Sequence, residues 1–543
     1  MTISTSIGWP ALTKRPRAPM RATVARLIFE RAVAGIPVRV TYPDGRVLGS
    51  GSPTSPEFEV VRPAAFFARL GRDAKIGFGE AYTAGDWRAG PGTDLADLLT
   101  PFASRVTTLI PAPLQRLRVL VDRRVPGNQE NTLDGSRANI AAHYDLSNDL
   151  FAAFLDPTMS YSSAWFDDSE PIAAATPLEE AQLRKIDGIL DLAGVQEGSR
   201  VLEIGSGWGS LAIRAAQRGA RVTAITLSHE QMRLARERVA AAGLSALVEV
   251  RVQDYREVDG EYDAIVSVEM IEAVGEAYWP AYFATLDRLL APGGRISLQA
   301  ITMAHDRFLA TRRSFSWIQK HIFPGGIIPS LHAVDDVLTA HTTLRVTRQR
   351  ELRPHYARTL RLWRERFLGQ WPHIHAQGFT ETFRRMWEFY LAYAEAGFRS
   401  GYLGVSQLQM AREPPAAALR AAASPAASVG ELTALLAGDA FSRAAALHAL
   451  GPSPDPASSD LLVDTLNGDQ RSAEHASWAL GDQSPVRRAA GLWLSRCRRV
   501  APRVHSRTDP RGVGRERRRT RHRRPHGTGA RRPPGRAGSD HSF

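Results

Sequence analysis

Short apolar runs, separated by longer stretches of helical periodicity, fill residues 200–300 of this 543-residue chain. Each run is too short for a helix, and most are rich in Val and Ile, which favour strands. Strands that alternate with helices predict an α/β fold with a doubly wound sheet. The predicted strands are 201–204, 221–226, 247–252, 263–268 and 295–299.

Three glycines at alternate positions, Gly205, Gly207 and Gly209, follow the first predicted strand. Glycine lets the backbone turn sharply and approach a ligand closely, and a helix that begins there offers unpaired N–H groups to a polar ligand. Taken alone, the turn fits a plain strand–helix connection, a dinucleotide site or a site for another nucleotide-like cofactor.

The residues around the glycine turn favour S-adenosylmethionine (SAM) as the ligand. The second predicted strand ends at Thr226, without the acid that a dinucleotide enzyme uses to hold a ribose. Asp254 stands in an acidic turn after the third strand, and Pro292, Gly293 and Gly294 precede the fifth. This layout is typical of SAM-dependent methyltransferases, whose core is Rossmann-like. No residue pattern indicates a metal site.

The rest of the chain divides by composition. Short helical and strand-like runs in 21–105 predict a small α+β domain. Aromatic residues crowd 310–395, where they form either an ordinary core or a cap over a long apolar substrate. We expect a flexible leader (1–20), an N-terminal domain with a helical linker (21–140), a methyltransferase domain with the cap (141–412), a linker (413–430), HEAT-like helical repeats (431–500) and a disordered basic tail (501–543).

The segment 431–500 contains an internal repeat with an offset of 30 residues. Leu436 matches Leu466, and Ala449 matches Ala479. Small residues at these positions are typical of packed helix pairs in short HEAT-like repeats. The segment is therefore either a protein-interaction module or an Ala-rich helical tail.

Most of the net charge of +13 lies in residues 501–543, which hold thirteen arginines and three acids. This tail either attracts an anionic membrane or resembles out-of-frame translation of a GC-rich gene, and we do not expect nucleic acid as a partner. No apolar run reaches the roughly 18 residues of a membrane span, and the N-terminus lacks the apolar core of a secretory signal. With Cys497 as its single cysteine, the chain fits a reducing cytoplasm.

Several ordered motifs carry a resemblance to a known family. Residues 143–151 read His-Tyr-Asp-Leu-Ser-Asn-Asp-Leu-Phe, and the glycine turn reads Val-Leu-Glu-Ile-Gly-Ser-Gly-Trp-Gly. Together the motifs resemble the cyclopropane-fatty-acyl-phospholipid synthases over roughly residues 20–410, including the N-terminal domain. The motifs are 78–87, 143–151, 159–162, 201–209, 253–256, 272–275 and 322–325.

The resemblance implies a set of SAM contacts. Tyr161 and Ser162 would close over SAM, and Glu203 would lie near its amino group. Asp254 has a plain alternative as the cap of a turn, and Tyr161 as a core residue. The residues expected at SAM are Tyr161, Ser162, Glu203, Gly205, Gly207, Thr226, Gln231, Asp254 and Tyr255.

The chemistry of this family is methyl transfer to an isolated double bond. The sulfonium methyl of SAM is a strong electrophile, and its transfer leaves a carbocation on the acyl chain. The site must exclude water, and aromatic faces can stabilise the positive charge. A base then removes a proton; loss from the new methyl closes a cyclopropane, whereas loss elsewhere gives a methyl-branched or methylene chain.

The usual base of the family is a bound bicarbonate, and its expected ligands are only partly present here. The chain keeps a glutamate as Glu272. It has Ser163 where the family has a cysteine, Gln299 where it has a histidine and Arg364 where the resemblance places a tyrosine. These departures count against bicarbonate as a cofactor.

Glu269 stands where the family commonly has glycine, at the end of the fourth predicted strand. Its carboxylate is expected to replace the missing anion, with Arg364 as its charge-assisted partner; the alternative is a plain structural ion pair. The altered residues resemble the actinobacterial branch that makes 10-methylene or 10-methyl fatty acids. We therefore expect Glu269, Glu272, Arg364, Gln299 and Ser163 to form the catalytic set.

These observations favour an enzyme that methylates unsaturated acyl chains of phospholipids at the surface of the cell membrane. The expected location is cytoplasmic and peripheral to the inner face of that membrane. The alternatives are an inactive lipid-binding or scaffolding protein and a soluble small-molecule methyltransferase. The sequence is also compatible with a homodimer and with a protein partner that binds the repeats.

Overall fold

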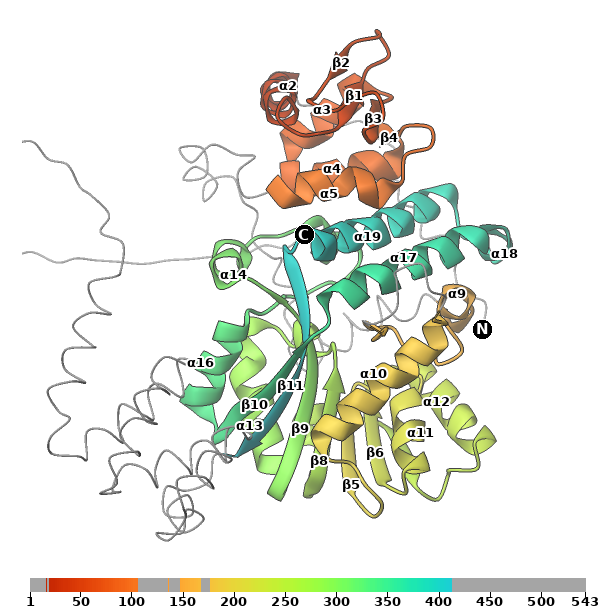
Figure 1. Ribbon diagram of the computed structural model, residues 1–543, viewed down its shortest axis with the longest axis vertical. Coiled ribbons are helices and arrows are strands. Elements are labelled where there is room, and N and C mark those ends of the chain that lie inside the picture. Colours follow the sequence, from red (N-terminus) through yellow and green to blue (C-terminus); the bar gives the residue numbers. More distant parts are fainter. Residues whose placement is uncertain (1–15, 17–18, 106–134, 136–146, 168–175, 413–543) are drawn as a thin grey trace, which may run out of the picture. The chain divides into compact units, whose positions relative to one another are not determined.

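The computed structural model describes residues 16, 19–105, 135, 147–167 and 176–412 (Figure 1). Its centre is a seven-stranded sheet in the order β10-β11-β9-β8-β5-β6-β7. The strands β7, β6, β5, β8 and β9 are parallel, and β11 is antiparallel to both β9 and β10. The strands are β5 (Arg200–Ile204), β6 (Arg221–Thr226), β7 (Val248–Val252), β8 (Tyr262–Val268), β9 (Leu290–Met303), β10 (Leu344–Glu351) and β11 (Leu403–Arg412).

The five parallel strands confirm the predicted α/β fold, with one difference at β9. This strand begins at Leu290 and therefore includes the Pro292–Gly294 segment, which we expected to precede it. Gly293 has a φ of 77°, and the pairing with β8 shifts register between Tyr262 and Ala264. The glycines thus produce an irregularity within the strand.

Helices cover both faces of the sheet, and the alternation of side chains along β5 shows how. Leu202 and Ile204 lie in one apolar cluster with residues of α13 (Trp279–Leu289) and α16 (Leu331–His341). Val201 points to the other face and joins residues of α10 (Leu178–Ala193), α11 (Ser210–Gln217) and α12 (His229–Ala241). Successive side chains of a strand alternate between its faces, so both sides of β5 contribute to the core.

The aromatic-rich segment 310–395 begins at the end of α14 (His305–Thr311). It then forms α15 (Trp317–His321), α16, α17 (Arg353–Gly369), α18 (Trp371–Ala376) and most of α19 (Glu381–Arg399), with β10 between α16 and α17. Most of its aromatic side chains are buried in one cluster that also includes α9 (Asn148–Phe154). Trp371 is partly buried, and Tyr393 is exposed. Ordinary core packing accounts for most of these residues, and a substrate cap stays a prediction.

The N-terminal residues form the expected small domain of helices and strands. Its four-stranded sheet has the order β2-β1-β3-β4, and Phe58 stacks on Trp87 with ring centroids 4.3 Å apart. The α4 and α5 helices of this region pack against α19. Its elements are α2 (Pro19–Val33), β1 (Arg39–Thr41), β2 (Val47–Leu48), β3 (Glu57–Val60), α3 (Pro63–Arg72), α4 (Ala74–Ala84), β4 (Trp87–Ala89) and α5 (Leu95–Arg105).

Several predicted segments lie outside the described residues. They are nearly all of the leader, most of the linker before residue 140, the linker 413–430, the HEAT-like repeats and the basic tail. Across the part of the chain that the structure does describe, no helix is long and apolar enough to cross a membrane.

Candidate active site

The glycine turn lies at the carboxyl end of β5 and leads directly into α11. Gly205, Gly207 and Gly209 all have positive φ angles, of 88°, 49° and 87°. A Cβ atom added at Gly207 would face open space, because no atom beyond its two chain neighbours lies within 4 Å. Glycine is the residue that adopts such backbone angles without strain.

A cavity of about 160 Å³ opens above this turn. The carboxyl ends of β5, β6 and β8 form its floor, which is the edge where doubly wound folds bind ligands. Every residue expected at SAM lines this one cavity: Tyr161, Ser162, Glu203, Gly205, Gly207, Thr226, Gln231, Asp254 and Tyr255. The individual contacts with SAM stay predictions.

Glu203 gives the cavity a binding group for a cation. It is buried at the end of β5, and its Oε2 atom has no hydrogen-bond partner among the described residues. Burial raises the pKa of its carboxyl to about 8, against the positive charge of Lys185. A buried carboxylate needs a partner, and the ammonium group of SAM would supply one. The residues present therefore fit the cofactor.

Polar residues at or just after the carboxyl ends of β6 and β7 line the other side of the cavity. Thr226 Oγ1 donates a hydrogen bond to Gln231 Oε1 (2.8 Å). Asp254 caps the short helix η2 (Tyr255–Glu257) and pairs with Arg256, with an Nε–Oδ1 distance of 2.7 Å. Asp254 therefore caps a turn, which was the alternative to a role at SAM, and it also lines the cavity. The guanidinium of Arg256 lies 5.3 Å from the ring centroid of Tyr255.

Aromatic side chains from three helices surround Tyr161, which closes another wall. The ring of Tyr161 lies 5.3 Å from that of Phe151 and 5.2 Å from that of Trp363, between ring centroids. Its hydroxyl lies 2.8 Å from the hydroxyl of Tyr390. Tyr161 thus packs on the aromatic core and faces the cavity as well. Such a wall limits the access of water.

The carboxylate of Glu269 accepts three hydrogen bonds at this cavity. Its Oε1 accepts from the backbone N–H of Ser163 (2.9 Å) and from Gln299 Nε2 (2.8 Å). Its Oε2 accepts from the hydroxyl of Tyr356 (2.6 Å). Burial raises the pKa of the Glu269 carboxyl, while these hydrogen bonds and the charge of Lys185 act in the opposite direction.

The backbone of Glu269 adopts the left-handed conformation, with a φ of 52°. This conformation explains why glycine is common at the position, because a side chain there costs about 1–2 kcal/mol. The Glu269 N–H donates to the carbonyl of Gln299 (2.7 Å), which holds the strained residue in place.

Gln299 and Ser163 support the carboxylate in different ways. Gln299 Oε1 accepts a hydrogen bond from Gln407 Nε2 of β11 (3.1 Å), which orients the amide so that its nitrogen faces Glu269. The Ser163 hydroxyl instead donates to the carbonyl of Ala164 (3.0 Å), so only the backbone of Ser163 reaches Glu269.

Glu272 lies beside this group. Its Oε1 accepts from the backbone N–H of Ile301, and its buried Oε2 has no hydrogen-bond partner among the described residues. Burial, together with the negative charge of Glu269, raises the pKa of the Glu272 carboxyl to about 8. Both effects favour the protonated form of this carboxyl.

Comparison with known proteins places this site in a family. The model of the mycolic acid cyclopropane synthetase family matches residues 131–408. Tuberculostearic acid methyltransferase UfaA1 of Mycobacterium tuberculosis is 53% identical over 412 residues, which cover 75% of this chain and 96% of UfaA1. The chain belongs to the mycolic acid cyclopropane synthetase family.

More distant relatives are similar over shorter spans. Cyclopropane-fatty-acyl-phospholipid synthase of Escherichia coli is 33% identical over 366 residues, or 65% of this chain and 87% of the relative. The solved structure of cyclopropane synthase MmaA2 from M. tuberculosis covers 51% of this chain and 98% of its own, with 32% identity and a TM-score of 0.47. The predicted family is confirmed, and this synthetase homologue is a SAM-dependent methyltransferase of unsaturated lipid acyl chains.

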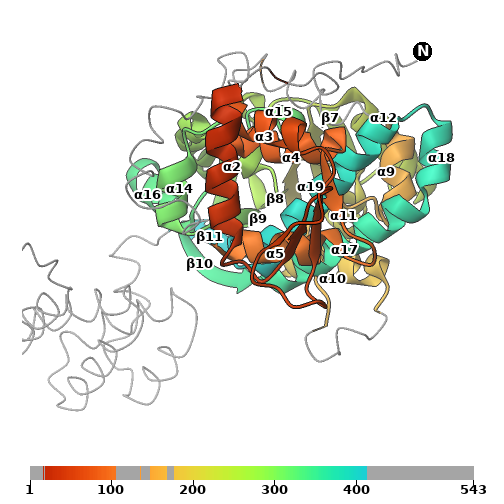
Figure 2. The same cartoon turned by 90° about the horizontal axis from the view of Figure 1, so that it is seen from above.

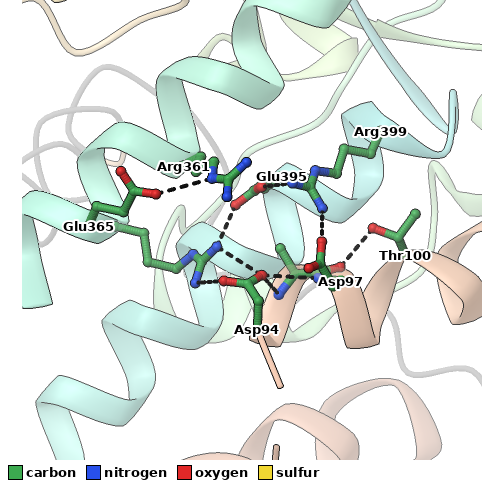
Figure 3. Close-up of polar contacts among 9 residues, drawn as sticks. Asp94, Asp97, Thr100, Arg361, Glu365, Glu395 and Arg399 are labelled. Atoms are coloured by element: carbon green, nitrogen blue, oxygen red, sulfur yellow. Dashed lines mark hydrogen bonds and ion pairs between the residues drawn. The ribbon is translucent and has the colours of Figure 1, made fainter. Parts of the chain in front are cut away.

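The prediction that Arg364 is the partner of Glu269 is wrong for this synthetase homologue. Arg364 lies on α17 and pairs with Asp94 (2.8 Å) and Glu395 (2.9 Å). Figure 3 shows Asp94 at the start of α5 and Glu395 on α19, close to Asp97 and Arg399. Arg364 therefore joins the N-terminal region to two helices of the methyltransferase domain and does not reach the cavity.

Tyr356 is a site residue that the sequence reasoning missed. It lies eight residues before Arg364 on the same helix, and its hydroxyl is the one that donates to Glu269. We expected position 364 of this helix to reach Glu269, but the residue that does so is two turns earlier. The sequence His355-Tyr-Ala-Arg was a usable signal, because it contains a tyrosine near the start of the helix.

Lys185 was also missed. It lies on the buried face of α10 with Gln182, Ile186 and Ile189, at helical spacing. Its Nζ donates to Ser162 Oγ (2.7 Å), and it lines the cavity. A lysine within an apolar stripe was the available signal, because a buried lysine needs a polar partner. Among the described residues, no group of three or more His, Cys, Asp and Glu side chains is placed to hold a metal ion.

Proposed function

We propose that this enzyme methylates the double bond of an unsaturated phospholipid acyl chain, and that Glu269 is the base that removes the proton afterwards. In this proposal the carboxylate of Glu269 takes the place of bicarbonate. The product is a methylene or methyl-branched chain. Bound SAM supplies the electrophilic methyl group.

One observation carries the proposal: the donors around Glu269 converge on its own carboxylate. The Ser163 N–H, Gln299 and Tyr356 all donate to its two oxygens. In the family pattern, a backbone amide, the residue at 299 and a tyrosine hold the bicarbonate. An internal carboxylate with the same kinds of donors supports the replacement of the external anion.

The hydrogen bonds leave Glu269 able to accept a proton. A carboxylate has about four acceptor sites, and three are used here. Oε1 receives two donors and Oε2 receives one, so Oε2 keeps a free lone pair. When the acyl carbocation loses a proton, the C–H electron pair becomes the new bond of the product and the proton goes to Oε2. Tyr356 holds this oxygen in position.

The names of the relatives support the branched product. UfaA1, at 53% identity, is named as a methyltransferase of a fatty acid. The relatives at 33–35% identity include proteins named as cyclopropane synthases. The altered positions 163, 269 and 299 of this chain agree with the branch that does not close a ring.

The direct test is the isosteric variant Glu269→Gln, together with Glu269→Gly. Glu269→Gln removes the charge at constant size, so turnover should fall about 100- to 10,000-fold while the Kd for SAM changes little. Glu269→Gly restores the glycine of the family and opens space, and added bicarbonate should recover part of its activity. Mass spectrometry of lipids labelled from methyl-labelled methionine, before and after hydrogenation, identifies the product.

The parent enzyme is the control and should not respond to bicarbonate. Full turnover of Glu269→Gln, together with loss of parent activity when bicarbonate is depleted, would show that the usual bicarbonate mechanism operates. A ring-containing product from the parent would contradict the branched-chain part of the proposal.

A further inference from the structure

The first helix that the structure describes, α2, packs on the N-terminal domain through one face. Phe29 and Val33 of this face are buried, and Phe29 contacts Phe66 with ring centroids 5.1 Å apart. The helix approaches α3 closely: a Cβ added at Gly71 would lie 2.6 Å from the backbone of Arg21. These contacts fix how the helix is rotated on the domain.

The opposite face of α2 is apolar and exposed. Met20, Val24, Leu27 and Ile28 have exposed fractions of 84%, 56%, 64% and 41%. Their spacing of i, i+4, i+7 and i+8 places them on one stripe of the helix. In the part of the chain that the structure describes, seven large apolar residues are exposed, and four of them form this stripe. Figure 2 shows α2 drawn in front of α3, along the outside of the domain.

Positive charge accompanies the stripe. Two arginines of α2 are exposed. Arg21 lies two turns before Ile28, and Arg31 lies one turn after Leu27. Arg26 is paired with Glu30, which is the first acidic residue of the chain. An apolar stripe beside arginines, with no exposed acid on the same face, is typical of helices that lie in the surface of an anionic membrane.

We propose that α2 docks this enzyme on an anionic phospholipid surface. The four residues of the stripe enter the boundary between headgroups and acyl chains, and Arg21 and Arg31 bind lipid phosphates. The inference rests on the proposed function in one respect, because phospholipid substrates lie in such a surface.

The geometry favours a lipid surface over a second copy of the chain. The stripe spans nine residues, Met20 to Ile28, or about 12 Å of helix. A stable dimer usually buries roughly 800 Å² on each partner, far more than four side chains on about two turns of helix provide. A symmetric contact would also bring the arginines of two copies together without an acid to pair them.

The test compares two double variants of the full chain. Val24→Glu with Leu27→Glu places two negative charges in the stripe. Val47→Glu with Leu309→Glu makes the same change at apolar residues that are 52% and 50% exposed elsewhere. Co-sedimentation uses vesicles of dioleoyl phosphatidylglycerol and phosphatidylcholine at low salt. The stripe variant should bind at least tenfold more weakly, about 1.4 kcal/mol, and the control variant should bind like the parent.

The stripe variant should keep the parent Kd for SAM and the parent turnover on the same phospholipid dispersed in detergent. This result separates docking from catalysis. If the parent binds vesicles through the stripe but methylates no phospholipid, docking stands and the proposed function fails.

Vesicle binding that is equal in the parent and the stripe variant would overturn the docking proposal, as would an equal loss in both double variants. Light scattering measures the oligomeric state of the parent and of the stripe variant. A parent dimer that becomes monomeric only in the stripe variant, with vesicle binding unchanged, would assign the stripe to a second copy and overturn the proposal.

Discussion

At the scale of single residues, the cavity combines one buried lysine with several carboxylates. Lys185 donates to Ser162 Oγ, and burial lowers its pKa to about 8, against the charges of Glu269, Asp156 and Glu203. The positive charge of Lys185 in turn lowers the pKa values of Glu203 and Glu269. Lys185 therefore helps to keep the base ionised.

Lys185→Met should move the pH dependence of turnover. Glu269 accepts a proton only when it is ionised, and loss of the neighbouring cation raises its pKa. When the medium is acidified, the turnover of Lys185→Met should therefore begin to fall at a higher pH than the turnover of the parent. The control is Gln182→Leu, which removes the hydrogen bond from Gln182 Nε2 to the Ser162 carbonyl (2.9 Å) without changing charge. The same acid shift in both variants would contradict the electrostatic role of Lys185.

Gly207→Val should abolish SAM binding while the protein stays folded. A Cβ atom added at Gly207 faces open space, and Gly207 lines the cavity, so the valine side chain enters the space left for the ligand. Gly243→Val is the matched control, because Gly243 also has a positive φ (72°), also has open space around it and does not line the cavity. Both variants carry similar backbone strain. Calorimetric binding of SAM by folded Gly207→Val at the parent Kd would rule out the proposed site.

At the scale of secondary-structure elements, a buried ion-pair cluster joins α5, α17 and α19. Glu395 is fully buried and pairs with Arg364 and Arg399, both at 2.9 Å. Arg364 also pairs with Asp94. Burial lowers the pKa of the Arg364 guanidinium, but the two carboxylates outweigh this effect and raise the pKa above its ordinary value. Figure 3 shows the acidic residues of this cluster between the helices.

Arg364→Met should destabilise the protein by about 3–5 kcal/mol, because it leaves the buried carboxylate of Glu395 without one of its two arginine partners and Asp94 without its partner. Arg361→Met on the same helix is the control. Its partner Glu365 is exposed, and such a surface pair contributes about 0–1 kcal/mol. Denaturant unfolding measures both changes. If Arg364→Met costs no more than Arg361→Met, the cluster does not hold these helices together.

At the scale of the whole molecule, β11 is the last strand that the structure describes, and we predict that the methyltransferase domain ends with it. The strand runs between β9 and β10 and ends at Arg412, whose Nε donates to Asp287 Oδ1 (2.8 Å). A chain that stops at 410 would remove this contact and the end of a central strand. The useful truncation point is therefore directly after Arg412.

The truncated chain 1–412 should keep full SAM binding and lipid methylation. Its strands are complete, and every residue around the cavity precedes the cut. Turnover of the truncated and full-length proteins on detergent-dispersed phospholipid provides the comparison, with folding checked by the cooperativity of unfolding. Loss of turnover in a stably folded 1–412 protein would mean that the segment after 412 contributes to catalysis.

The amino-acid sequence by itself determined the parallel strands and the glycine turn, and its resemblance to the family indicated nine of the residues that line the cavity. These features depend on local signals: apolar runs form strands, and glycine alone adopts the angles of the turn without strain. Parallel strands also end at one edge of a sheet, so residues that follow them, such as Asp254 and Glu269, lie along the same edge.

Only the tertiary structure decided which distant residues complete the site. Tyr356 and Arg364 lie on one helix, and the rotation of α17 against the core sends the first to Glu269 and the second to Asp94 and Glu395. The strands β10 and β11 were not predicted, because polar residues interrupt their apolar pattern. Contacts of this kind depend on how elements far apart in the chain pack together, and periodicity within one element contains no information about its partner.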